Sequence, residues 1–484
     1  MSSAIKSVKA IFSGYTIVTL VGFIFTPLLV RILNQNDYGI YVTIFAAFGI
    51  IELLSKGGSF DSVRKFIAEN SDDTKEQSKI VTTSLIVYSF WSLIIMFIWV
   101  SLELTGLIPL PYSKYAPLLV ISLLSVNILT VVRSFYYGVQ KESVSEKLSI
   151  LQTLMFTFFS IILTYVGLGV KGIIYSYTIS YISTSLLGLI YLFFDNIVSI
   201  PSIQLLQKYS KRVISYGGIQ VIGGLAAMFL YKTDVLLMSH FHGPLKTAQY
   251  NAAIIPAEFI WFIPSIIQAA FLQRTAKYWS ESNIKKINEQ LKIGIKYGIL
   301  SLSLFGIGLF GSAFPFIYVY FGPEYTSAVL SLKILILGTF FFGLSRVSIS
   351  VFQATGWVKY TELVTVLALC LNIFLNYIFI PTYGLIGAAI STSLSYIVIF
   401  VGNMVIWKIS IFNFPSILWV CKIISVQLVF GVFYISVTYV LNLSPFNSLM
   451  VSPLIGLIVF LSINMYAGII DIDKLCALFY PDLE

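Results

Sequence analysis

Two arginines at matching places in the chain, Arg133 and Arg346, carry the side chain best suited to binding phosphate. Each is followed seven residues later by a glutamine, Gln140 or Gln353, and each lies near the end of a long apolar stretch. A guanidinium group binds phosphate oxygens through two parallel hydrogen bonds. We therefore interpret both arginines as candidate binding residues for an anionic ligand. The alternative is that they snorkel to a membrane surface.

Four further charged residues fall within or at the end of apolar stretches: Arg31, Lys232, Asp234 and Glu258. A cationic cavity attracts anions, so Arg31 and Lys232 are candidate binding residues, with anchoring at a membrane interface as the alternative. A buried carboxylate can titrate near neutral pH, so Asp234 and Glu258 are candidates for exchanging protons or cations. We place Glu258 in the middle of its apolar stretch. An ion pair with Lys232 or another base is the alternative role for these carboxylates.

The amino-acid composition indicates that the apolar stretches carrying these residues lie in a membrane. The chain has 484 residues, of which 58% are hydrophobic and only 11% charged, whereas a soluble domain has about 25% charged residues. The apolar runs are about 20 residues long, the length of a membrane-spanning helix. Backbone groups in lipid must be paired within the segment, which favours helices, and barrel strands would be shorter and alternating. We therefore predict an all-α polytopic membrane protein.

Hydropathy divides the chain into about fourteen transmembrane helices. The approximate limits are 10–31, 38–55, 80–104, 115–138, 148–168, 171–194, 213–238, 247–272, 292–320, 327–352, 360–381, 384–408, 415–441 and 447–470. The connections between these spans are too short to hold a folded domain.

The net charge of +9 is distributed unevenly between the two sides of the predicted spans. Lysine and arginine gather in the segments 56–79 and 274–296, which lie on one side. The few basic residues expected on the other side are Arg31, Lys114, Lys171 and Lys246. This bias predicts that both termini are cytoplasmic. Basic residues dispersed over short loops give no support to nucleic-acid binding.

Segments 168–182 and 383–397 repeat one pattern. The matched pairs are Gly169/Gly384, Gly172/Gly387, Ser176/Ser391, Ser180/Ser395, Tyr181/Tyr396 and Ile182/Ile397. On a helix these small residues form one stripe, and such stripes let helices approach closely in lipid. We therefore assign helix packing to Gly169, Gly172, Gly384 and Gly387. The alternative is that the smooth faces slide past each other during a conformational cycle.

The repeat, together with the order of the spans, predicts two parallel sets of six helices followed by an addition. The expected divisions are an N-terminal six-helix bundle (1–194), a cytoplasmic linker (195–212), a C-terminal six-helix bundle (213–410), and two additional transmembrane helices with a cytoplasmic tail (411–484). Transporters built from two related halves place the substrate path between them.

Three segments resemble a known family. The segment 372–389 reads Asn-Ile-Phe-Leu-Asn-Tyr-Ile-Phe-Ile-Pro-Thr-Tyr-Gly-Leu-Ile-Gly-Ala-Ala, and it is similar to the signature of polysaccharide-type flippases. The segment 27–33 followed by Asp37-Tyr38-Gly39 also resembles that family, as does Lys232-Thr233-Asp234 with Tyr250 following. The family belongs to the multidrug/oligosaccharidyl-lipid/polysaccharide (MOP) exporter superfamily, and the resemblance covers about residues 8–410.

The resemblance implies two six-helix bundles around a central cavity, often with two extra helices. It also implies alternating access that moves undecaprenyl-pyrophosphate-linked sugar repeat units from the cytoplasmic to the outer leaflet for O-antigen, capsule or related glycans. Arg133 and Arg346 would then meet the pyrophosphate. The expected location is the bacterial cytoplasmic (inner) membrane, and the expected partners are membrane lipids, a polysaccharide polymerase and chain-length machinery. No cofactor is expected, and a proton or sodium gradient is the candidate energy source.

Two other functions stay open at this point. A cation-coupled multidrug and toxin extruder would share the superfamily architecture. A membrane glycan polymerase would need a large outer loop for its active site, and the expected outer loops such as 240–246 and 321–326 are short. We find no nucleotide-binding Walker motif and predict no enzyme activity. His240 and His242 stand without further ligands, so we predict no metal site.

Overall fold

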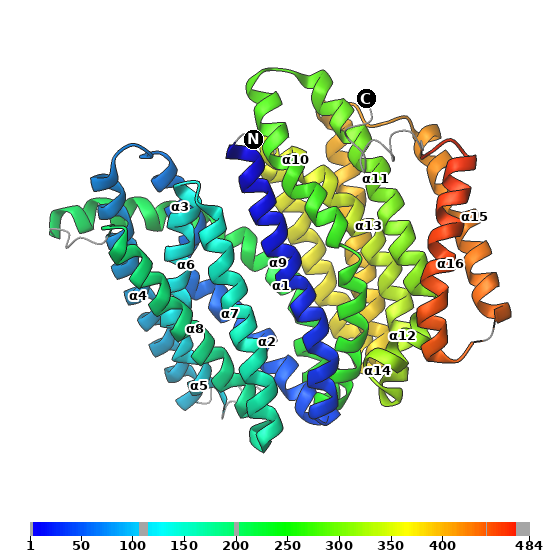
Figure 1. Cartoon of the computed structure of the whole chain (residues 1–484), viewed down its shortest axis with the longest axis horizontal. Helices are drawn as coiled ribbons and strands as arrows, with labels where there is room; N and C mark the ends of the chain where they lie inside the picture. The colour runs from blue at the N-terminus through cyan, green and yellow to red at the C-terminus, as the bar shows by residue number, and fades with distance from the viewer. Residues whose placement is uncertain (1–2, 106–114, 198–202, 442, 471–484) are drawn as a thin grey trace. The chain divides into compact units, whose positions relative to one another are not determined.

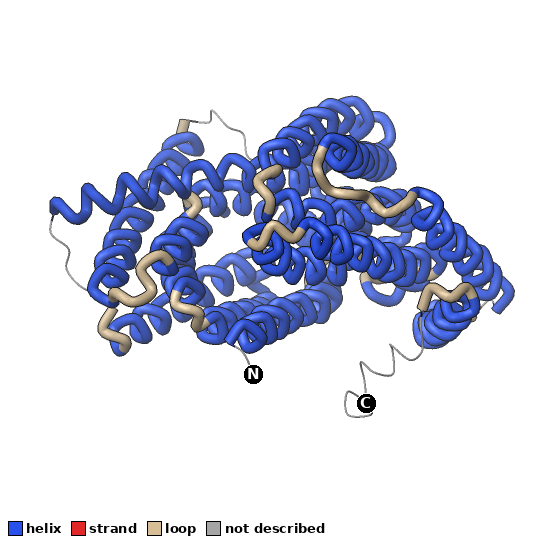
Figure 2. Tube along the Cα trace, turned by 90° about the horizontal axis from the view of Figure 1, so that it is seen from above, coloured by secondary structure: helices blue, strands red, loops and turns tan. Residues whose placement is uncertain are grey.

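The computed structural model describes residues 3–105, 115–197, 203–441 and 443–470. All the regular secondary structure in these ranges is helical (Figure 1), and a perpendicular view shows only helices joined by short loops (Figure 2). Eleven of the described helices are long and apolar enough to cross a membrane. The chain is therefore an all-α multi-pass membrane protein, as its composition predicts.

The chain divides into two compact units, residues 1–248 and 249–484. The first unit contains α1 (Ser3–Ile32), α2 (Gln35–Lys56), α3 (Ser59–Ala68), α4 (Thr74–Leu104), α5 (Ala116–Val120), α6 (Ser122–Gly138), α7 (Glu142–Leu163), a π-helical turn (Thr164–Leu168), α8 (Gly169–Phe194) and most of α9 (Ile203–Phe259). The second contains the end of α9, α10 (Phe262–Ser280), α11 (Ile284–Gly311), α12 (Ala313–Tyr320), a 3₁₀ turn (Pro323–Ala328), α13 (Val329–Ala354), α14 (Val358–Ile409), α15 (Ile417–Leu441) and α16 (Pro445–Tyr466).

Three of the eleven candidate membrane helices are longer than 50 residues: 142–194, 209–259 and 358–409. Each contains a glycine with non-helical backbone angles, at Gly167, Gly243 and Gly384 respectively. Each therefore contains more than one of the spans that hydropathy separates. The count of fourteen crossings and the expected domain limits stay predictions.

The chain reverses direction at two of these breaks. Helices α7 and α8, which flank Gly167, pack against each other. In α14 the Asn372 amide Nδ2 lies 3.4 Å from Thr392 Oγ1, although 20 residues of straight helix span about 30 Å. The segment 358–409 is therefore a helical hairpin with its turn at Gly384.

Two glycines of the repeated pattern lie where the paired helices touch. A Cβ at Gly172 would approach the backbone carbon of Leu163 to 2.9 Å. A Cβ at Gly387 would collide with the carbonyl oxygen of Phe379. In each hairpin the second helix therefore passes so close to the end of the first that no side chain fits between them.

The structure corrects the continuity of two predicted spans. The span 247–272 is broken by a turn at residues 260–261 between α9 and α10. Glu258 therefore lies in the last turn of α9 and not in the middle of a helix. The span 292–320 is likewise broken, since α11 ends at Gly311 and α12 begins at Ala313.

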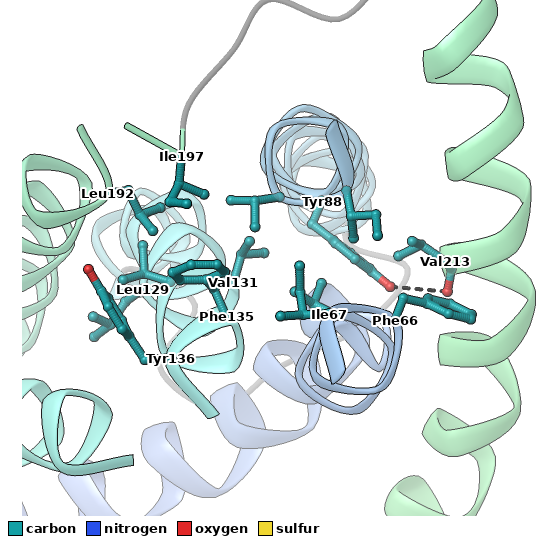
Figure 3. Close-up of a cluster of buried hydrophobic side chains, with 14 of the residues drawn as sticks. Phe66, Ile67, Tyr88, Leu129, Val131, Phe135, Tyr136, Leu192, Ile197 and Val213 are labelled. Carbon is teal, nitrogen blue, oxygen red and sulfur yellow. Dashed lines mark hydrogen bonds between the residues drawn. The ribbon is translucent and has the colours of Figure 1, made fainter. Parts of the chain in front are cut away.

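The predicted loop 56–79 contains a short helix, α3. Gly57 and Gly58 adopt left-handed backbone angles, with φ of 55° and 71°. These angles end α2 and lead the chain into α3. One face of α3 buries hydrophobic side chains, including Phe66 and Ile67, against the first unit's core. In that core the Tyr88 hydroxyl donates to the Val213 carbonyl at 3.4 Å (Figure 3). The same hydroxyl lies 3.0 Å from Ser62 Oγ. This packing fixes the end of α2, where charged residues gather.

Candidate functional site

Arg133 on α6 lies in a charged contact with α7. Its Nη2 is 3.4 Å from Glu146 Oε1, and its Nε donates to Ser145 Oγ at 3.2 Å. The Tyr137 hydroxyl donates to the same Glu146 oxygen at 2.6 Å. Two neighbouring residues of α7, Ser145 and Glu146, therefore orient the Arg133 guanidinium through two of its nitrogens.

The other oxygen of the Glu146 carboxylate lies against α1. A Cβ placed at Gly14 would collide with Glu146 Oε2, and α1 packs along α7. Glycine at this position leaves room for the carboxylate between the two helices. Helix α1 therefore helps to position the counter-ion of Arg133.

A second charged contact joins the end of α2 to α8. Lys56 Nζ is 2.5 Å from Glu52 Oε1, and the Tyr177 hydroxyl donates to Glu52 Oε2 at 2.6 Å. Tyr177 is also hydrogen-bonded to Tyr181. Each oxygen of Glu52 thus has its own partner, as a carboxylate in an apolar environment requires.

The two contacts form one network, because Lys56 and Tyr181 both lie within electrostatic range of Arg133. We call it the charged network of the first unit, and its members are Glu52, Lys56, Arg133, Tyr137, Glu146, Tyr177 and Tyr181. It contains two cations and two carboxylates, so its formal charges balance.

The cations of the network are more accessible than their carboxylate partners. The side chains of Lys56 and Arg133 are 32% and 27% exposed, whereas those of Glu52 and Glu146 are 17% and 11% exposed. An incoming anion could therefore reach the Arg133 guanidinium while the carboxylates stay buried. The geometry suits binding of a multiply charged anion such as a phosphate group.

Arg346 on α13, in the second unit, has a different environment. Its Nη1 donates to Gln268 Oε1 at 3.1 Å. Its guanidinium carbon lies 5.1 Å from the ring centroids of both Trp261 and Phe342. Its Nε is buried without a hydrogen-bond partner among the described residues. Cation–π contacts and one amide therefore orient Arg346, which leaves donor capacity for a ligand.

The aromatic residues around Arg346 are themselves well fixed. The Trp261 indole nitrogen donates to the Thr339 carbonyl at 3.1 Å. The Phe342 ring stacks on Tyr396 with centroids 4.7 Å apart, and Tyr396 also contacts Trp261 edge-on at 5.5 Å. Trp261 lies in the turn between α9 and α10, so the break in the predicted span 247–272 positions this ring.

The remaining predicted site residues lie on α1 and α9. Arg31 is exposed in the last turn of α1, where a cation interacts favourably with the helix dipole. Asp234 is 2% exposed, and its Oδ1 accepts from the Val235 amide at 2.7 Å. Lys232 is half-buried. Arg133 and Arg346 belong to different compact units, and whether both face one cavity stays a prediction.

Sequence reasoning missed three charged members of the network: Glu52, Lys56 and Glu146. The predicted spans place Lys56 and Glu146 in connections, where Lys56 serves only as an indicator of orientation. The sequence spacing of the network residues could have indicated that they share a helix face. Glu52 and Lys56 are four residues apart, and so are Tyr177 and Tyr181. Residues four apart face the same side of a helix.

The chain is similar to several known families and proteins. A family model described as Polysaccharide biosynthesis protein matches residues 4–276, more than half of the chain, and one described as MatE matches residues 221–378. A Shigella flexneri protein named Putative O-antigen transporter is 27% identical over 404 residues, covering 79% of this chain and 93% of that protein. An uncharacterized membrane protein of Methanocaldococcus jannaschii is 21% identical over 182 residues, covering 37% of this chain and only 36% of that protein.

Solved structures share the fold. The structure of the lipid II flippase MurJ in an inward closed conformation matches with a TM-score of 0.76 at 15% identity, and covers 98% of this chain and 99% of that one. An inward-facing multidrug resistance MATE family transporter of the MOP superfamily matches with a TM-score of 0.61 at 20% identity, and covers 80% and 94%. At these identities the likeness concerns the fold alone.

Proposed function

We infer that this chain, which belongs to the polysaccharide biosynthesis protein family, is a flippase for lipid-linked oligosaccharides. Its proposed cargo is an undecaprenyl-pyrophosphate-linked sugar repeat unit, moved from the cytoplasmic to the outer leaflet for O-antigen, capsule or related glycans. The name of the Shigella flexneri relative supports this cargo class, and the MOP fold supports transport by alternating access.

The observation that carries the proposal is the charged network of the first unit. A pyrophosphate carries several negative charges, and Arg133 and Lys56 are the cations of the network, with side chains more exposed than those of their carboxylate partners. As the head group enters, its oxygens replace Glu146 and Glu52 as partners of these cations. Tyr137 and Tyr177 keep their hydrogen bonds to the two carboxylates. Each carboxylate then keeps one hydrogen-bond donor after its cation has turned to the ligand, which limits the cost of leaving it buried.

Arg346 is the proposed phosphate ligand of the second unit. Its guanidinium is held by aromatic faces rather than by a carboxylate, so an anion binding there would need to displace no counter-ion among the described residues. The sugar residues and the head group occupy the cavity while the prenyl tail stays in lipid. The protein lies in the bacterial cytoplasmic membrane with both termini inside, and it delivers its product to a polysaccharide polymerase.

A cation-coupled drug extruder is the second candidate, and the match of the MatE model to residues 221–378 favours it. A cationic drug would need an exposed carboxylate to bind, and the carboxylates of the network are less exposed than its cations. The charged network therefore favours an anionic cargo. Asp234 and Glu258 are the proposed coupling carboxylates if a proton or sodium gradient drives transport.

Deletion in the native host followed by complementation tests the function. Loss of the protein should remove the surface glycan and leave complete lipid-linked repeat units in the inner leaflet. The chain carrying both Lys56→Ala and Arg133→Ala should fail to restore export, whereas Lys285→Ala, a change of an exposed lysine outside the network, should restore it. Single repeat units accumulating on the outer leaflet would indicate a polymerase. Drug sensitivity with an intact surface glycan would indicate an extruder.

A further inference from the structure

A cavity of about 350 Å³ lies where three helices of the first unit end, away from the charged network. Helix α6 ends there at Gly138, α7 begins at Glu142, and α8 ends at Phe194. The candidate membrane spans 117–138 and 142–194 have the same limits. The cavity therefore lies at the level where the spans meet the membrane surface.

Matched apolar stripes form the floor of this cavity. Val144, Leu148 and Leu151 line it from α7 at positions i, i+4 and i+7. Leu187, Tyr191 and Phe194 line it from α8 with the same spacing. Residues at this spacing share one face of a helix. The floor is thus a furrow between two helices, directed along the membrane span.

The rim of the cavity is basic and polar. Lys141 and Lys147 line it, and both are exposed. The single carboxylate in the lining, Asp195, accepts a hydrogen bond from the Tyr136 hydroxyl at 3.1 Å and lies 3.9 Å from Lys141. Tyr136 itself belongs to the edge of the buried cluster shown in Figure 3. The lining therefore has a net positive charge beside an apolar furrow.

We propose that this cavity binds an anionic phospholipid of the bilayer, with its phosphate at Lys141 and Lys147 and an acyl chain along the α7–α8 furrow. Basic pockets between membrane helices bind anionic lipid head groups in this way. The volume suits a head group and the start of one chain, while the rest of the lipid stays in the bilayer. The charge of the rim and the apolar floor match the two parts of one lipid molecule.

The cavity is separate from the proposed cargo site. Glu146 follows Val144 by two residues, which places it about 200° around α7 from the face that lines the cavity. Glu146 accordingly contacts Arg133 and lies against α1. One helix thus presents one face to the charged network and the opposite face to the lipid cavity. The lipid proposal therefore does not depend on the proposed function.

Native mass spectrometry of the full-length protein, titrated with phosphatidylglycerol or with phosphatidylcholine, tests the proposal. The wild-type chain should bind phosphatidylglycerol more tightly than phosphatidylcholine. The Lys141→Gln, Lys147→Gln double variant should lose about fivefold in phosphatidylglycerol affinity for each lysine removed. The matched control is Lys285→Gln with Lys286→Gln, which removes two exposed lysines at the start of α11 and should keep the wild-type preference.

A second variant tests the furrow without changing charge. Leu151→Trp should fill the apolar floor and weaken binding of both phospholipids. Unchanged phosphatidylglycerol affinity in the double lysine variant would overturn the proposal. So would undecaprenyl phosphate competing for the same site and losing affinity through the same two substitutions, because the cavity would then be a cargo site.

Discussion

Gly169 and Gly384 adopt the same backbone conformation although they lie 215 residues apart (384 − 169 = 215). Gly169 has φ 52° and ψ −132°, and Gly384 has φ 53° and ψ −126°. This region is open to glycine and strongly unfavourable for residues with a Cβ. Three residues later, Gly172 and Gly387 each pack on the end of the preceding helix. The repeated sequence therefore specifies the same turn between two helices twice, once in each unit.

Substituting these turn glycines should destabilise the protein through backbone strain. Gly169→Ala and Gly384→Ala should each cost about 1–3 kcal/mol. The thermal unfolding midpoint of detergent-solubilised protein measures this loss. The control is Gly308→Ala, at a helical position with open space around it, which should leave the midpoint unchanged or raise it slightly. Equal losses at Gly308 and Gly384 would contradict the conformational argument.

The close approach of Gly14 to the Glu146 carboxylate predicts a coupled pair. Gly14→Ala alone should destabilise the protein by about 1–3 kcal/mol, since the new methyl group overlaps Glu146 Oε2. The Glu146 Cβ would also lie 2.8 Å from the new methyl group, so the whole side chain must be removed. Glu146→Gly does this, and adding Gly14→Ala to it should cost far less. A double-mutant cycle on unfolding midpoints measures the coupling. Additive losses would mean that α1 and the carboxylate do not interact.

The two arginines should both be needed for export. At native expression levels, Arg133→Ala and Arg346→Ala should each abolish surface glycan in the complementation assay, because each removes a proposed phosphate ligand. Arg133→Lys should retain only part of the activity, since an ammonium keeps the charge but loses the two-pronged hydrogen bonding. The amount of each variant in the membrane fraction serves as the folding control. Full export by both alanine variants would refute the phosphate-binding role.

Coupling to an ion gradient should depend on the α9 carboxylates. Asp234→Asn and Glu258→Gln each remove one ionisable group with little change in shape. If either group couples transport, its variant should lose the response of flipping to an imposed proton or sodium gradient in proteoliposomes. Flipping by the wild-type chain that is independent of both gradients would exclude coupling through these residues.

The sequence was a good guide to the apolar segments and a poor guide to the charged network, for a physical reason. Hydropathy marks the apolar part of a helix, whereas helices continue into polar sequence. Helix α7 begins at Glu142, six residues before the predicted span 148–168, so Glu146 is a helical residue beside Arg133. Glu52 and Lys56 likewise lie on the last turns of α2, where the sequence reads as a span end followed by a basic loop.

The environment of Arg346 could not be predicted for another reason, and it supplies the last test. Trp261 contacts Arg346 from a turn 85 residues away in sequence (346 − 261 = 85), so no helical spacing reveals the pair. Trp261→Phe keeps an aromatic face but loses the bond to Thr339, whereas Trp261→Leu loses both. A cation–π contact contributes about 0.5–2 kcal/mol, so export should fall further in the leucine variant. Equal losses of export in the two variants would show that the indole hydrogen bond, and not the aromatic face, positions Arg346.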